Sequence, residues 1–142
     1  MFRFLSVLIL IFAKQATATE DVCYNKITAS NICEEAVQLR QELASNLPQQ
    51  LSQNLLWRSV GSQKNIITAN VMLMYSRDFL EKAVVAGGRT MSSIEQQMIQ
   101  MTQTMVCSMP HTSAFINHGG VLQYHYMFET GEFYLQANVN AC

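Results

Sequence analysis

Charged residues are scarce in this chain, where Asp, Glu, Lys and Arg together make up 13% of 142 residues. Nine basic residues stand against ten acidic ones, and no stretch gathers several lysines or arginines. Nucleic acids and anionic membrane surfaces attract proteins through such basic clusters, because both carry dense phosphate charge. The composition therefore argues against both kinds of partner.

Long apolar runs are missing except near the start of the chain. Residues 1–3 form a short basic start, and residues 4–13 are almost entirely apolar. Ala-Thr-Ala at 16–18 has the small-x-small pattern that signal peptidase recognises. The run is too short for a permanent membrane span of about 20 residues, and no later stretch reaches that length. We expect residues 1–18 to be a signal peptide cleaved before Thr19, and the protein to be exported.

Proline is also scarce, with two residues, whereas apolar residues reach 49% of the chain. Low charge, few prolines and many Asn, Gln and Met residues are typical of a folded domain with neutral polar surfaces, not of a disordered segment. Residues 19–142 have the length of a single domain. Loss of residues 1–18 removes two basic residues and shifts the formal charge from −1 to −3.

Hydrophobic periodicity predicts a helix, two strands, two or three further helical segments and two final strands. Helices that pack on one face of an antiparallel sheet, in a two-layer α+β domain, are the architecture that this order favours. No clear period is present in residues 19–30 or 49–54. The predicted helices are 32–47, 77–86, 92–106 and 112–118, and the predicted strands are 55–60, 66–75, 121–128 and 133–141.

Capping residues and alternation support several of these elements. Asn31, Ser76 and Ser92 are expected N-caps, the first with Glu34 and the third with Glu95 as capping-box partners. In the strand 66–75, apolar residues alternate with a mixed set. In the last strand, one face is predicted to carry Phe133, Leu135, Ala137, Val139 and Ala141.

The four cysteines all follow the predicted cleavage site, and an oxidising compartment would let them pair. Cys107 ends a predicted helix and Cys142 ends the last strand, so a bridge would join the helical layer to the sheet. It would close a loop of about 36 residues and contribute roughly 3–4 kcal/mol in the chain-entropy model. Cys23 and Cys33 would then pair. Four cysteines allow three connectivities, and the other two stay open.

Recognisable catalytic and metal-binding motifs are also missing. A reactive Cys107 with His111 or His118 as base is the alternative to a bridge, and the even cysteine count disfavours it. The histidines at 111, 118 and 125 are predicted in a loop, at a helix end and in a strand, so they are not expected to converge on zinc. No HExxH pair, serine elbow or phosphate-binding loop is present. We expect no metal, no cofactor and no enzymatic activity.

Methionine is abundant, with nine residues. In the predicted helix 92–106, Met98, Met101 and Met105 share one face with Ile94. Such a stripe is either core filling or an adaptable apolar groove for a partner helix, because thioethers repack around different shapes. Our hypothesis is that these three methionines contact a protein or peptide partner, for which an amphipathic helix is one form.

The frame of Cys107 and Cys142 resembles the AspS-type pilotins of bacterial type II secretion. A cysteine at a helix end, a turn with Pro110, a strand entry after two glycines and a terminal cysteine recur there in this order. The resemblance covers residues 44–142. The segments that carry it are 44–48, 66–75, 105–110, 115–121, 124–126, Gly131 and Cys142.

The resemblance implies a pilotin-like α/β domain with a bridge between Cys107 and Cys142. Pilotins of this family bind a short C-terminal helix of a secretin subunit and escort it to the outer membrane, which depends on a lipidated N-terminal cysteine. Here Cys23 follows Thr-Glu-Asp-Val, which is no lipobox. We therefore expect no lipid anchor.

Three functions remain open. The first is an exported, non-catalytic binding protein of a Gram-negative bacterium, either a secreted type II secretion substrate with a virulence-type role or a periplasmic protein. The second is an unlipidated periplasmic pilotin or chaperone for a secretin. The third is a small extracytoplasmic hydrolase or immunity protein. The missing lipobox favours the first over the second, the missing catalytic motifs disfavour the third, and the oligomeric state stays open.

Overall fold

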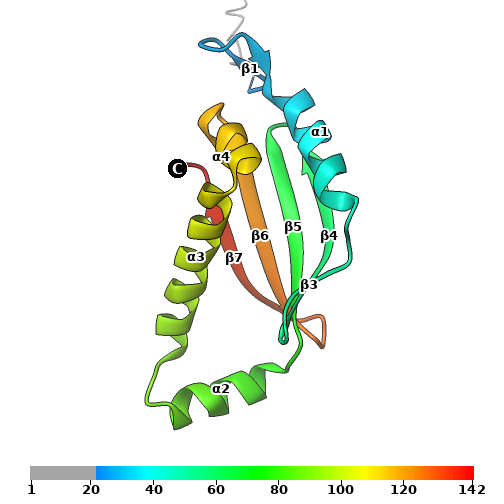
Figure 1. The fold of residues 1–142 in the computed structure, drawn as a ribbon. Coiled ribbons are helices and arrows are strands. Elements are labelled where there is room, and N and C mark those ends of the chain that lie inside the picture. The colour runs from blue at the N-terminus through cyan, green and yellow to red at the C-terminus, as the bar shows by residue number, and fades with distance from the viewer. Residues whose placement is uncertain (1–21) are drawn as a thin grey trace, which may run out of the picture.

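The computed structural model describes residues 22–142, so the predicted signal peptide lies outside the described residues. Its main feature is a five-stranded sheet in the order β3-β4-β5-β6-β7 (Figure 1). Three of its four helices pack on one face of this sheet, in agreement with the two-layer α+β prediction. The strands are β3 (Gln49–Ser52), β4 (Leu55–Gln63), β5 (Ile66–Leu73), β6 (Val121–Phe128) and β7 (Phe133–Val139).

Two antiparallel hairpins, β4–β5 and β6–β7, form most of the sheet, as predicted. They meet side by side through β5 and β6, which run parallel from the pair Ile66–Val121 to the pair Leu73–Phe128. The sheet is therefore mixed and not wholly antiparallel. Three helices lie between β5 and β6 in the chain, and such a long crossover over one face brings the chain back in the same direction.

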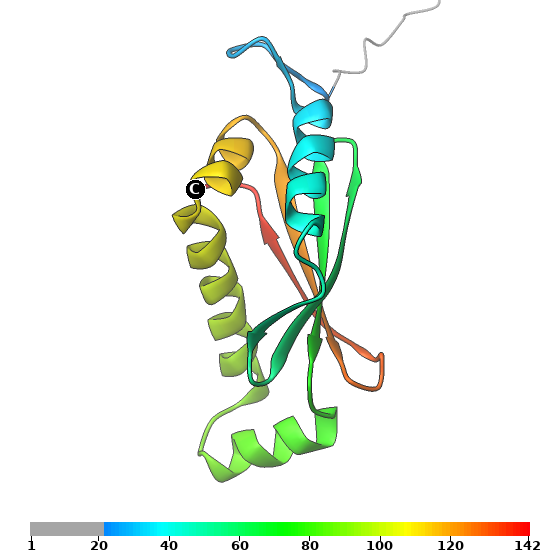
Figure 2. The same ribbon diagram turned by 45° about the vertical axis from the view of Figure 1, so that its right-hand side comes forward.

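The helices are α1 (Ile32–Ala44), α2 (Arg77–Ala86), α3 (Met91–Ser108) and α4 (Pro110–Asn117). Helix α1 packs on β4 and β5, α3 packs on β7, and α4 packs on α1, α3 and β6. Figure 2 shows α1 and α3 on the same side of the sheet, with α2 at its lower end. No helix in residues 22–142 combines the length and the hydropathy that a membrane crossing requires.

Alternation along the central strands builds the core. In β5 and β6 every second residue is buried, and the residues between them are only half-buried. The predicted alternation in 66–75 is thus confirmed. The buried set consists of Ile67, Ala69, Val71 and Leu73 on β5 and Leu122, Tyr124, Tyr126 and Phe128 on β6.

The alternation predicted for the last strand fails at its start. Met127 pairs with Phe133 but Tyr126 pairs with Leu135, so Tyr134 is an extra residue in β7. Such a bulge reverses the side on which the following residues lie. Phe133 is therefore 54% exposed, while Ala137 and Val139 are buried as predicted. The ring of Tyr134 instead lies 4.9 Å from that of Phe128.

The helix starts agree with the sequence in two of three cases. The side chains of Asn31 and Ser76 cap α1 and α2 as expected. The capping box of α3 is formed by Thr90 and Ser93, so the predicted box of Ser92 and Glu95 is wrong. Thr90 has the extended backbone that an N-cap needs, whereas Ser92 already lies within the helix.

Two boundaries near the first proline also differ. Helix α1 ends at Ala44, three residues earlier than predicted. Strand β3 was not predicted, because all four of its residues are exposed and no apolar alternation marks it. It is an edge strand that pairs with β4.

Both disulfides follow the pairing that the sequence favoured. Cys23–Cys33 ties a short hairpin, β1 (Tyr24–Asn25) and β2 (Ser30–Asn31), to the start of α1. The Cys107–Cys142 bridge joins the end of α3 to the short segment that follows β7. No free cysteine is present among residues 22–142, so the reactive-thiol alternative for Cys107 is wrong.

Candidate functional site

Helix α3 places its three predicted partner-binding methionines in different environments. Met98 and Met105 are half-buried and pack against the core, whereas Met101 is 61% exposed. Thr102, which is not part of the predicted stripe, is buried between them. The methionines therefore do not form one continuous face: two belong partly to the core and one belongs to the surface.

A shallow hollow of about 450 Å³ runs along the outer side of α3. Met101 and Met105 supply its apolar surface, and Gln97, Gln100 and Thr104 supply its polar rim. No charged side chain is among these five lining residues. The hollow suits a partner with an apolar surface, because binding there would not bury a charged side chain without a partner.

Two buried tyrosines of β6, Tyr124 and Tyr126, have different hydroxyl environments. Thr102 donates to the carbonyl oxygen of Met98, so the Tyr126 hydroxyl, 2.7 Å from Thr102 Oγ1, donates to Thr102. The Tyr124 hydroxyl has no hydrogen-bond partner among the described residues. Burial raises the pKa of both phenols, and the nearby Tyr126 raises that of Tyr124 further. Both tyrosines are therefore neutral, and Tyr126 contacts α3 through Thr102.

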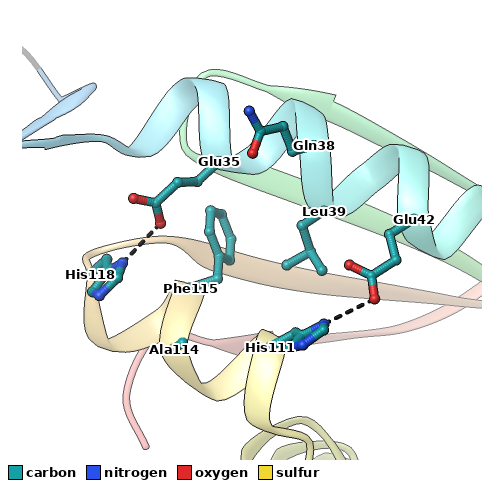
Figure 3. A pocket seen from close by; sticks show the side chains of 8 residues that line it. All are labelled: Glu35, Gln38, Leu39, Glu42, His111, Ala114, Phe115 and His118. Atoms are coloured by element: carbon teal, nitrogen blue, oxygen red, sulfur yellow. Dashed lines mark hydrogen bonds and ion pairs between the residues drawn. The ribbon is translucent and has the colours of Figure 1, made fainter.

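A second cleft, of about 280 Å³, lies between α1 and α4 (Figure 3). Leu39 and Phe115 lie near its middle, and an imidazole–carboxylate pair stands at each end. His111 Nδ1 lies 2.9 Å from Glu42 Oε1, and His118 Nδ1 lies 2.9 Å from Glu35 Oε2. The full lining is Glu35, Gln38, Leu39, Glu42, His111, Ala114, Phe115 and His118.

The two pairs follow from matched spacing on two helices. Glu35 and Glu42 are seven residues apart on α1, and His111 and His118 are seven apart along α4 and its C-cap. Seven residues are nearly two helical turns, so each set lies on one side of its helix. The first glutamate meets the second histidine, which requires antiparallel helices. The equal spacing was a sequence signal, but the sequence did not identify the partners.

The cleft joins two helices and contains no nucleophile. An imidazole paired with a carboxylate is the arrangement of a general base, but no serine, threonine or cysteine lines the cleft for it to activate. The third histidine, His125, lies on β6 with its Nε2 3.0 Å from Gln136 Oε1. In the described part of the chain, no three His, Cys, Asp or Glu side chains are grouped so that they could hold a metal ion.

No protein-family model matches the chain, and no curated protein does. Three solved structures share its fold. The pilotin EpsS of the type 2 secretion system of Vibrio vulnificus superposes with a TM-score of 0.60 at 15% identity, over 78% of this chain and 88% of that one. A Pseudomonas aeruginosa protein described as secreted gives 0.58 at 14%, over 78% and 89%.

The third structure is the type II secretion pilotin AspS of Vibrio cholerae, with a TM-score of 0.56 at 11% identity over 77% of this chain and 88% of that one. At such identities the likeness establishes the fold alone. The fold expected from the resemblance is confirmed: the chain has a pilotin-like α+β fold with helices on one face of a mixed sheet.

Proposed function

We propose that this chain is an exported, non-catalytic binding protein that holds a protein partner on α3. Its pilotin-like fold, shared with two type II secretion pilotins and a protein described as secreted, supports a link to type II secretion. We propose further that it leaves a Gram-negative cell as a substrate of that system and acts in a virulence-type role. Two disulfides agree with a protein that folds in an oxidising compartment before release.

The observation that carries the partner-binding proposal is the exposure of Met101 in an uncharged hollow. Met101 is 61% exposed beside the half-buried Met105, and the two side chains give an uncharged hollow an apolar surface that a partner could cover. Methionine adapts to different apolar shapes, so the occupant we propose is the apolar face of an amphipathic helix.

A second function has one observation in its favour. Two of the three similar structures are pilotins, so an unlipidated periplasmic pilotin or chaperone for a secretin would use the same fold. The hollow on α3 would then hold a helix of the secretin. The hydrolase reading has no comparable support, because the imidazole–carboxylate pairs lie in a cleft whose lining lacks a nucleophile.

Cell fractionation separates the two functions. The protein would be followed in the supernatant, periplasm and envelope of its host, with type II secretion intact and disabled. We expect it in the supernatant only when the system works. Retention with the envelope in both strains would contradict the secreted role and favour the pilotin role, which binding of a synthetic secretin C-terminal peptide would then test.

The binding surface is tested by Met101→Asp against Gln103→Asp. The two positions are about 200° apart around α3, so the control places the same charge on the other flank of the helix. We expect Met101→Asp to abolish retention of the native partner and Gln103→Asp to leave it unchanged, with equal melting temperatures. Normal binding by a folded Met101→Asp protein would show that the partner lies elsewhere.

A further inference from the structure

The face of the sheet opposite the helices is not covered by any described element. Helices α1, α3 and α4 pack on the side that carries the buried residues of β5 and β6. On the open side the alternate residues of both strands are half-buried, only because their neighbours in the sheet shield them. This open face spans four strands, β4 to β7. It consists of Leu56, Thr68, Asn70, Met72, Gln123, His125, Met127, Phe133, Gln136 and Asn138.

An apolar row crosses one end of the open face. Leu56 pairs with Met72, Met72 pairs with Met127, and Met127 pairs with Phe133, so four apolar side chains stand in register. Phe133 is 54% exposed, and Met74, just beyond β5, is 42% exposed. A continuous apolar row of this kind is unusual on a surface that stays in water.

Two polar rows without Lys, Arg, Asp or Glu complete the open face. Asn70 pairs with His125 and His125 with Gln136, and in the next row Thr68 pairs with Gln123 and Gln123 with Asn138. The Asn70 amide donates to Ser59 Oγ at 3.0 Å. Among the residues of the four strands β4, β5, β6 and β7, the only Lys, Arg, Asp or Glu is Arg58. Its Nη1 lies 3.9 Å from the Met72 sulfur.

We propose that the open face packs against the same face of a second copy of this chain and forms a two-fold dimer. In a two-fold interface each residue meets the same surface on its partner, so a charged face would repel itself. This face has almost no charge, and its side-chain amides both donate and accept hydrogen bonds. It is therefore complementary to itself. The proposal is independent of the partner on α3, which lies over the opposite face.

The size of the open face fits this occupant. Four strands spaced about 4.8 Å apart, with about eight residues of about 3.3 Å each, give a sheet area of roughly 500 Å² per copy. Two copies would bury roughly 1,000 Å² as a flat area, and side-chain relief increases this figure. That total meets the threshold of about 1,000 Å² for a biological interface. Two twisted sheets would stack about 10 Å apart with their strands near −30°.

Asn70 is the residue that tests the symmetry. It lies near the middle of β5, which is the central strand of the five, so a two-fold axis through the face would bring it close to its own copy. Asn70→Asp and Asn70→Lys each place like charges opposite one another. An equimolar mixture of the two variants places Asp opposite Lys. The matched controls are Gln96→Glu and Gln96→Lys on the exposed side of α3.

The measurement is sedimentation equilibrium on protein exported from the full-length gene, from micromolar to millimolar concentration. We expect the wild type and both Gln96 variants to dimerise, each Asn70 variant to dissociate at least about tenfold more readily, and the mixture to regain dimer. Thermal melts establish that each variant is folded, and the pair Gln123→Glu and Gln123→Lys on β6 repeats the test if an Asn70 variant is not.

Three outcomes would overturn the dimer. If the wild type stays monomeric at every concentration, a second copy does not bind the open face. Dimers that persist unchanged in both folded Asn70 variants place the interface elsewhere. Dissociation that the mixture does not reverse shows that the variants do not face each other across a two-fold axis.

Discussion

The two faces of one sheet differ more than their strands suggest. Val71 and Met72 are neighbours on β5, yet Val71 is fully buried under the helices and Met72 stands in the open row. The covered face is aliphatic and aromatic, while the open face combines thioethers, amides and one imidazole with Leu56, Thr68 and Phe133. The comparison teaches that the covered face holds the fold together, and that the open face is free to serve an interface.

Truncation of one large residue on each face should give the largest difference between the two faces. Phe128→Ala on the covered face should lower the free energy of unfolding by about 3–5 kcal/mol, because a fully buried ring would leave a cavity. Gln123→Ala on the open face of the same strand should change it by less than about 0.5 kcal/mol. Urea unfolding of dilute protein measures both, and similar losses would show that the open face also carries the fold.

The two disulfides differ in the same way. Cys142→Ser should cost roughly 3–4 kcal/mol, because its bridge closes the longer loop and fastens α3 to the strand layer. Cys33→Ser should cost less, because its bridge joins two residues only 10 positions apart, in a hairpin outside the five-stranded sheet. Thermal melts of both variants decide this. A Cys142→Ser protein with the wild-type melting temperature would contradict the role of that bridge.

The smallest predicted effect concerns two tyrosine hydroxyl groups on the covered face. Tyr126→Phe should cost about 1 kcal/mol, because it removes the hydrogen bond to Thr102. Tyr124→Phe should be neutral or stabilise the protein by about 1 kcal/mol, because it removes a buried hydroxyl without a partner. Guanidinium unfolding of the two variants measures the difference. A loss in Tyr124→Phe as large as that in Tyr126→Phe would reveal a partner for the Tyr124 hydroxyl, such as a buried water.

Much of the fold could be predicted because its signals are local. The caps at Asn31 and Ser76 act within three residues, and the alternation of β5 and β6 repeats every two residues. Strand β3 lacked such a signal because it is exposed throughout. The bulge at Tyr134 also escaped prediction, because it depends on how β7 is aligned with β6.

The candidate site was less predictable. The sequence placed Met98, Met101 and Met105 on one face of a helix, but the packing of α3 turned Thr102 inward and left Met101 outside. The pairs of Glu35 with His118 and of Glu42 with His111 join residues 83 and 69 positions apart. Such pairs form only when α1 and α4 meet, so spacing alone predicts that they are possible and not that they exist.

By itself, the sequence determined the helices, most strands, the favoured cysteine pairing and the two-layer class, because these depend on periods and on contacts within a few residues. Only the tertiary structure decided the parallel pairing of β5 with β6, the exposed methionine, the imidazole–carboxylate pairs and the uncovered sheet face. Each of these depends on which distant surfaces meet. That choice is made by the summed burial of the whole core and not by any one segment.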